Sequence, residues 1–182
     1  LEHNYFVIGT STNGKVKIQH PNFFPVKLDL PKSSSIAKAV TKIKKFSPIT
    51  VLINNAAVKI EPEENRMNIS LLKQTLNINL IGLIELTKSL IPDIIDGGKI
   101  VNFSSKRGSL SYDGTGTCPA YRISKTAVNM YTRTLAKRLE NRKISVSSFD
   151  PGWVKTDLGG QEAIRSPETP ALELLEHLNS NL

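Results

Sequence analysis

The strongest constraint on the fold is an alternation of short apolar runs with longer segments of helical periodicity. Five runs have the length and composition of buried strands, and four longer segments repeat apolar residues at helical spacing. The predicted strands span residues 5–10, 26–29, 50–53, 99–103 and 144–149, and the predicted helices span 33–46, 70–91, 119–141 and 167–180. Apolar strands separated by helices form parallel sheets with right-handed crossovers. The sequence therefore predicts an α/β fold with a doubly wound, Rossmann-type parallel sheet and helices on both faces.

Length and composition narrow the class of protein. The 182 residues are 39% hydrophobic, which predicts one domain over residues 1–182. The longest apolar run, residues 78–86, is too short and too interrupted to span a membrane. One cysteine, Cys118, excludes an internal disulfide framework, and the three histidines lack the spacing of metal ligands. The chain shows no secretory leader, so we expect a cytoplasmic protein with no metal site and no membrane partner.

The net charge of +8 is compatible with an anionic ligand. The basic residues are dispersed, however, and Lys38, Lys42, Lys44 and Lys45 have the spacing of a solvated helix face. The chain has neither an RNA-binding aromatic signature nor zinc-finger spacing. We therefore expect no nucleic-acid partner.

Polar residues follow all five predicted strands, where a doubly wound sheet binds its ligands. In chain order these residues are 10–13, Asp29, 54–57, Ser104 with Ser105, and 150–156. Because the carboxyl ends of parallel strands meet at one edge, the pattern predicts a ligand site there.

Tyr121 and Lys125 are four residues apart on a predicted helix and therefore share one face. An unperturbed phenol has a pKa near 10, and a neighbouring ammonium favours its phenolate form. The pair predicts a tyrosine that exchanges a proton, with Lys125 lowering the pKa of Tyr121.

This ordered set resembles the short-chain dehydrogenase/reductase family over residues 1 to about 158. The matching motifs are Asn54-Asn55-Ala56-Ala57, Asn79, Ser105, Tyr121-x-x-x-Lys125 and Pro151-Gly152, and residues 151–160 resemble the carbonyl-reductase-like members. The resemblance implies a nicotinamide-dependent oxidoreductase that acts on a small-molecule carbonyl or alcohol.

The resemblance also implies residue roles. Tyr121 is the expected general acid and base, Ser105 hydrogen-bonds the carbonyl oxygen, Lys125 binds the nicotinamide ribose, and Asn79 holds a water in the proton relay. The implied cofactor-binding residues are Thr12, Asp29, Leu30, Asn55, Ala56, Ala57, Tyr121, Lys125, Pro151, Gly152, Val154 and Thr156.

The cofactor is expected to be NADP(H), with NAD(H) left open. Residues 10–15 contain no acid to hold the ribose hydroxyls of NAD(H), and Lys15 and Lys17 lie close by. Substrate identity is poorly encoded, but Tyr112 and Cys118, in the stretch between Ser105 and Tyr121, are expected to shape the pocket.

Several residues have structural alternatives. Ser104 competes with Ser105 for the serine role, Asn54 and Asn55 suit an ordinary turn, and Asp29 suits a helix cap. These alternatives stay open on the sequence alone.

The sequence departs from the family at both ends. Residues 1–2 resemble the end of the first family helix, so the first strand and the glycine-rich turn, which precede that helix in the family, have no counterpart here. The final strand of the family has no counterpart either. The first family strand is central, so we expect an incomplete fold with two half-sheets. Either the sequence is part of an active reductase, or it is a non-catalytic binding or interaction module without the cofactor phosphate-binding loop. The presence of Asn79, Ser105, Tyr121 and Lys125 favours the reductase, with helices 70–91 and 119–141 as expected homo-oligomer surfaces.

Overall fold

The predicted alternation of strands and helices is confirmed in a computed structural model, which describes residues 5–64, 66–112 and 114–180. The strands are β1 (Val7–Ser11), β2 (Phe23–Lys27), β3 (Ile49–Asn54), β4 (Ile94–Phe103) and β5 (Ser145–Phe149). The helices are α1 (Ser33–Ile43), α2 (Ile69–Leu76), α3 (Leu83–Leu90), α4 (Pro119–Leu139) and α5 (Glu168–Asn179).

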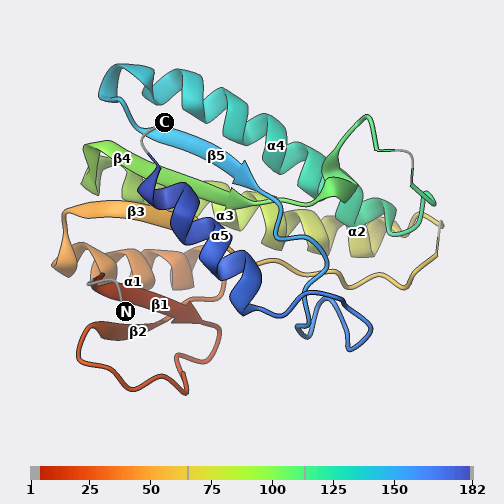
Figure 1. Cartoon of the computed structure of the whole chain (residues 1–182), viewed down its shortest axis with the longest axis horizontal. Helices are drawn as coiled ribbons and strands as arrows, with labels where there is room; N and C mark the ends of the chain where they lie inside the picture. The colour runs from red at the N-terminus through yellow and green to blue at the C-terminus, as the bar shows by residue number, and fades with distance from the viewer. Residues whose placement is uncertain (1–4, 65, 113, 181–182) are drawn as a thin grey trace.

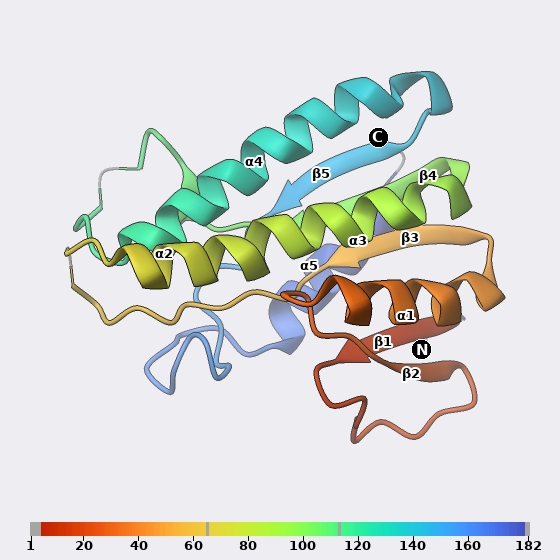
Figure 2. The ribbon, with the colours of Figure 1, turned by 180° about the vertical axis from the view of Figure 1, so that it is seen from behind.

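The strands form two separate parallel sheets. One sheet pairs β1 with β2, and the other has the order β3-β4-β5. In the larger sheet Val101 of β4 pairs with Ile53 of β3 and with Ser147 of β5. The β1–β2 pair lies on the β3 side of the larger sheet, and its strands run in the same direction as those of that sheet (Figures 1 and 2). The expected doubly wound fold with two half-sheets is therefore confirmed.

Helices cover both faces of the larger sheet. α1, α3 and α4 lie on one face, and α5 lies on the other (Figures 1 and 2). The end of α5 is tied to β4 because the Lys99 ammonium donates to the carbonyls of Leu178 and Ser180, each at 2.8 Å. His177 of α5 hydrogen-bonds Ser147 of β5 at 2.9 Å. These contacts hold α5 across the strands that carry the carboxyl-end loops.

The apolar core has two parts that meet at β3. Ile49 and Leu52 of β3 pack against both parts. The first part contains Val26, Leu28, Leu30, Ile36, Ala39, Val40, Ile43, Leu86 and Leu90, and the second contains Ile94, Ile100, Leu135, Leu139 and Ile144. The alternation of apolar residues that predicted the elements therefore corresponds to real burial.

Several element boundaries differ from the prediction, and the differences are largest in three elements. β2 begins and ends earlier than the predicted 26–29, and β4 begins at Ile94, five residues before the predicted 99. The predicted helix 70–91 is divided by a π-helical segment, Asn77–Gly82, between α2 and α3. Periodicity does not reveal such an insertion, because the helix axis continues and the apolar face is only slightly displaced.

Close packing explains the glycine at the end of the π-helical segment. A Cβ atom on Gly82 would lie 2.5 Å from the carbonyl oxygen of Leu30 and 2.8 Å from its Cβ. Real Cβ atoms do not approach backbone oxygens this closely, so α3 can contact the loop after β2 only with glycine here.

Among the described residues, no helix is both long and apolar enough to cross a membrane.

Candidate active site

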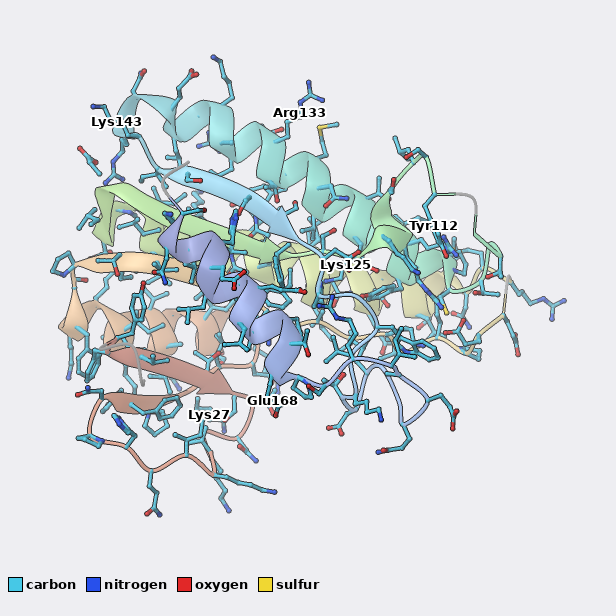
Figure 3. The ribbon with its side chains drawn as sticks, in the orientation of Figure 1. Lys27, Tyr112, Lys125, Arg133, Lys143 and Glu168 are labelled. Carbon is cyan, nitrogen blue, oxygen red and sulfur yellow. The ribbon has the colours of Figure 1, made fainter. Side chains whose placement is uncertain are left out.

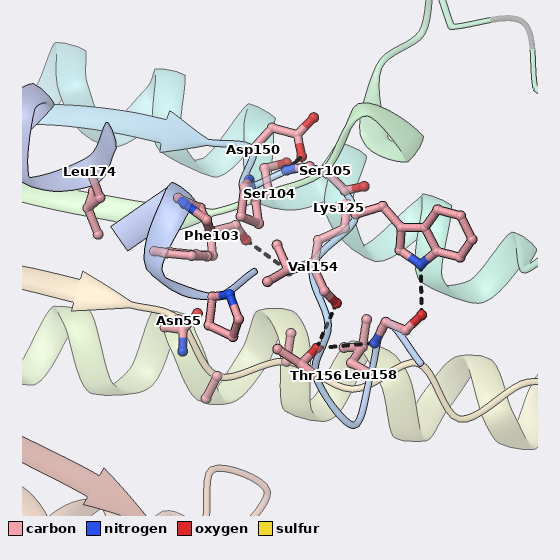
Figure 4. Close-up of a pocket in the computed structure, with 18 of the residues that line it drawn as sticks. Asn55, Phe103, Ser104, Ser105, Lys125, Asp150, Val154, Thr156, Leu158 and Leu174 are labelled. Atoms are coloured by element: carbon pink, nitrogen blue, oxygen red, sulfur yellow. Dashed lines mark hydrogen bonds between the residues drawn. The ribbon is translucent and has the colours of Figure 1, made fainter. Parts of the chain in front are cut away.

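A cleft of about 620 Å³ lies at the carboxyl ends of β3, β4 and β5. Ten of the predicted site residues line it: Asn55, Ala56, Ala57, Ser105, Tyr121, Lys125, Pro151, Gly152, Val154 and Thr156. Figure 4 shows Asn55 just past the end of β3 and Ser104 and Ser105 past the end of β4. Residues that are up to about a hundred positions apart in the chain therefore share one cavity, as the strand-end argument predicted.

Four predicted residues do not line this cleft: Asn79, Thr12, Asp29 and Leu30. The Asn79 side chain is 1% exposed and holds the backbone of Val58, accepting from its N–H at 2.8 Å and donating to its carbonyl at 2.9 Å. It also donates to Ser124 of α4 at 3.0 Å. Asn79 thus joins the π-helical segment to α4 and to the chain after β3, and its water-holding role stays a prediction.

Asp29 is not a helix cap. Its carboxylate pairs with Lys32 at 2.6 Å, and the residue before α1 makes no side-chain cap. Leu30 is buried in the core, whereas Thr12 is exposed after β1. Their cofactor roles stay predictions that concern the carboxyl ends of β1 and β2, away from the cleft.

Asn54 is a buried structural residue rather than an exposed turn residue. Its amide donates to Thr87 of α3 at 2.9 Å and to Asn102 of β4 at 2.8 Å. Asn102 in turn donates to Thr132 of α4 at 2.9 Å. Because a buried amide without partners is costly, this network fixes β3 and β4 relative to the two helices.

Tyr121 lies in the first turn of α4 and is 7% exposed. Burial raises the pKa of its phenol above the ordinary value, and hydrogen bonding by the nearby Ser105 side chain acts in the opposite direction. The net shift is upward, so the expectation that Lys125 lowers the pKa of Tyr121 is not met. The physical reason is that desolvation of the phenolate outweighs the favourable neighbours.

Lys125 is almost completely buried and lies one helical turn after Tyr121 in α4. Figure 3 labels Lys125 near the middle of the molecule. Its ammonium donates to the carbonyl of Phe103, at the end of β4, at 2.8 Å. The nitrogen lies 5.6 Å from the centre of the Tyr121 ring. Burial lowers the pKa of Lys125 to about 8, which still leaves the group mainly protonated at neutral pH.

The two neighbouring serines point to different partners. Ser104 is 7% exposed and donates to Asn129 of α4 at 2.6 Å. Ser105 accepts from the N–H of Arg107 at 3.2 Å and lies close enough to affect the acidity of Tyr121. The geometry therefore favours Ser105 as the serine that faces a ligand.

A close contact between Gly108 and α4 holds Ser105 near Lys125. A Cβ atom on Gly108 would lie 2.7 Å from the carbonyl carbon of Lys125. The short 3-10 helix that follows Ser105, Lys106–Gly108, therefore packs directly on the α4 backbone.

Asp150 joins two of the loops that form the cleft. Its carboxylate accepts from the N–H of Lys106 at 2.9 Å and from the N–H of Gly152 at 3.0 Å. In the sequence, the position of Asp150 after a predicted strand is the only signal of this role.

The far wall of the cleft was not predicted. It is lined by Trp153, Leu158 and four residues at or in α5, namely Pro167, Pro170, Ala171 and Leu174.

Neither Tyr112 nor Cys118 lines the cleft, so the expectation that they shape it is wrong. Tyr112 stacks outward against Lys106 and Arg122, and Cys118 is buried at the start of α4.

The fold and the cleft agree with the comparison to known families. The family description "short chain dehydrogenase" matches residues 9–166, which is most of the chain. The protein belongs to the short-chain dehydrogenase family.

Individual relatives support this assignment. The mouse short-chain dehydrogenase/reductase family 9C member 7 is 32% identical over 144 residues, which is 76% of this chain and 45% of that protein. The structure of the carbonyl reductase Sniffer of Drosophila melanogaster superposes with a TM-score of 0.81 at 28% identity, covering 89% of this chain and 72% of that one. An NADPH-bound carbonyl reductase from chicken fatty liver superposes with a TM-score of 0.80 at 27% identity, covering 90% and 71%. The chain thus spans less than half of the mouse relative.

The described residues contain no cluster of three or more His, Cys, Asp or Glu side chains arranged to hold a metal ion.

Proposed function

We propose that the protein reduces a carbonyl compound, or oxidises the corresponding alcohol, with a nicotinamide cofactor. One observation carries the proposal: Ser105, Tyr121 and Lys125 line the same cleft as residues 55–57 and the turn at Pro151. A buried tyrosine close to a buried ammonium is suited to moving a proton to or from a ligand in the cleft.

Each group has a specific task. The Tyr121 hydroxyl donates its proton to the carbonyl oxygen as hydride adds to the carbon, and Ser105 donates a hydrogen bond to the same oxygen. Because burial raises the pKa of Tyr121, the phenol keeps its proton at neutral pH, as reduction requires. Ser105 and Arg107, the neighbours that lower the pKa of Tyr121, stabilise the phenolate left after transfer, and reprotonation of this phenolate completes the cycle.

The residues in the cleft fit a nicotinamide cofactor, which supplies the hydride when bound. The Lys125 ammonium has three N–H donors, and within the described residues one of them meets the Phe103 carbonyl. The remaining donors suit ribose hydroxyls. The small side chains of Ala56 and Ala57 leave room for a ring at the end of β3.

Replacing Tyr121 with Phe tests the proposed acid. The substitution removes one oxygen from a buried ring, so we expect turnover to fall on the order of 10²-fold to 10⁴-fold while NADPH binding persists. NADPH absorbance should be followed in the whole protein with a panel of aldehydes, ketones and quinones. Tyr131→Phe on the same helix is the matched control. Full activity in the Tyr121 variant would reject the assignment.

We further propose that NADP(H) is the preferred cofactor. The chain after β1 carries no acid through residue 15, and the Ser11 hydroxyl and the lysines at 15, 17 and 27 provide donors and positive charge nearby. The chicken carbonyl reductase, which binds NADPH, is consistent with this choice.

Thr12→Asp tests the cofactor preference. A carboxylate after β1 repels the extra phosphate and can accept from ribose hydroxyls, so the kcat/KM ratio of NADPH to NADH should fall by about tenfold or more. Thr12→Ser, which keeps the hydroxyl, is the control. A wild-type preference for NADH would refute the proposal before any variant is made.

The alternative of a non-catalytic interaction module is less favoured, because Ser105, Tyr121 and Lys125 all line one cleft. Association through the predicted helices remains a proposal. It is supported by exposed apolar side chains on these helices, namely Ile81, Ile123 and Met130. Light scattering of the whole protein measures its oligomeric state.

A further inference from the structure

One short segment contacts the π-helical segment that carries Asn79, the 3-10 helix that follows Ser105, and α4, which carries Tyr121 and Lys125. We call residues 58–64, which follow β3, the strap. Its Val58 backbone is held by Asn79, and its Glu63 carboxylate accepts from Arg107, close to Ser105, at 3.3 Å and from Thr117 at 3.0 Å. Hydrogen bonding to Lys59, at 2.6 Å, contributes most to lowering the pKa of Glu63 to about 2. The strap is therefore tied to its surroundings on several sides.

Glu61 connects the strap to the start of α4. Its side chain is 7% exposed. One carboxylate oxygen accepts from the N–H of Tyr121 at 2.7 Å, and the other accepts from the N–H of Ala120 at 3.1 Å. The proposed acid is thus held at its own amide by a residue 60 positions earlier in the chain.

Among the described residues, no neighbouring side chain caps the start of α4. Cys118 occupies the cap position with a left-handed backbone, φ 55°, and makes no side-chain cap hydrogen bond. The first N–H groups of a helix have no partners within the helix, and they form its positive end. A buried carboxylate that accepts hydrogen bonds from two of these N–H groups gives them the partners they lack. The positive helix end in turn stabilises the negative charge of the carboxylate.

We propose that Glu61 is a positioning residue that fixes the first turn of α4 and thereby sets the location of the Tyr121 hydroxyl in the cleft. The proposal rests on the proposed function of Tyr121. Lys125, one turn later, has its own anchor in the Phe103 carbonyl. Loss of Glu61 is therefore expected to displace Tyr121 more than Lys125.

Two substitutions grade this effect. Glu61→Gln keeps the shape and one acceptor oxygen, but its amide group faces the second N–H as a donor. Glu61→Ala removes both acceptors. Glu140→Gln is the matched control, because Glu140 lies just beyond the other end of α4 and forms an exposed ion pair with Lys137.

The first measurement does not depend on activity. Amide hydrogen exchange of the whole protein should become about tenfold faster at Ala120 and Tyr121 in Glu61→Gln, and faster still in Glu61→Ala. Exchange at Leu135, in the same helix, should be unchanged. Exchange at residues 120 and 121 equal to that of the wild type would overturn the proposal.

The second measurement is steady-state kinetics. We expect kcat to fall about tenfold in Glu61→Gln and on the order of 10²-fold in Glu61→Ala, with KM for NADPH changed by less than about twofold. Normal kcat in both variants, or a rise in KM with kcat intact, would overturn the proposal. If the wild-type protein shows no turnover with any carbonyl compound, the proposed function fails instead, and the exchange data still decide whether Glu61 holds the turn.

Discussion

At the scale of single residues, Lys125 shows how burial and charge oppose each other in the site. The side chain is 3% exposed, and desolvation lowers its pKa from 10.5 to about 8. Between these two values the unfolded chain binds more protons than the folded one, so folding stability from this group rises with pH across that window. Below about pH 8 the cost of the buried charge is present in full.

Lys125→Met is therefore expected to stabilise the fold at neutral pH. Removing a buried charge of this kind should gain on the order of 1 to 3 kcal/mol near pH 7, and the gain should shrink as the pH approaches 10.5. Urea unfolding across that range measures it, with the exposed Lys42→Met as control. A loss of stability at pH 7 would mean that the hydrogen bond to Phe103 outweighs the cost of burial.

At the scale of elements, the π-helical segment between α2 and α3 brings two long-range contacts together. Asn79 at its centre holds the strap and α4, and Gly82 at its end lies against the loop after β2. π-helical turns are rare and occur often at functional sites. Here the extra residue allows an amide to face α4 while the following turn approaches a backbone carbonyl.

Gly82→Ala tests this close approach. The new methyl group would overlap the Leu30 carbonyl in the loop after β2, so we expect a loss of about 1 to 3 kcal/mol. Lys88→Ala on the exposed side of α3 should change stability by less than about 0.5 kcal/mol. Urea denaturation measures the free energy of unfolding of each variant. Equal losses of stability in Gly82→Ala and Lys88→Ala would contradict the packing argument.

At the scale of the whole molecule, the two half-sheets leave β1 and β3 unpaired with each other. Unpaired strand edges are templates for association, and charged side chains on an edge strand discourage it. Ile53 of β3 is 42% exposed at such an edge.

We expect the 182-residue chain by itself to associate as its concentration rises. Ile53→Lys should reduce the apparent mass measured by size-exclusion chromatography with light scattering. Ile164→Lys makes the same change at a residue that is 80% exposed and lies outside the strands, and it should have little effect. A monodisperse wild-type monomer at all concentrations would show that the edges are protected in another way.

The sequence by itself determined the order of strands and helices and most of the cleft, because these features follow from local patterns. The separation into two half-sheets was expected from the resemblance to the family, whose central first strand has no counterpart here. Apolar runs such as residues 50–53 predict strands because burial on both faces requires them, and parallel strands must end together at one edge. The common location of the polar residues after β3, β4 and β5 at one edge of the sheet was therefore predictable from the sequence.

Only the tertiary structure decided which side chains share an environment. The Glu61 carboxylate meets α4 across 60 positions, α5 closes the cleft with apolar residues, and Asn79 turns to the strap rather than into the cleft. The direction of the Tyr121 pKa was likewise decided by burial rather than by the neighbouring lysine. Desolvation and long-range hydrogen bonds depend on the relative placement of whole elements, and no local pattern of residues carries that information.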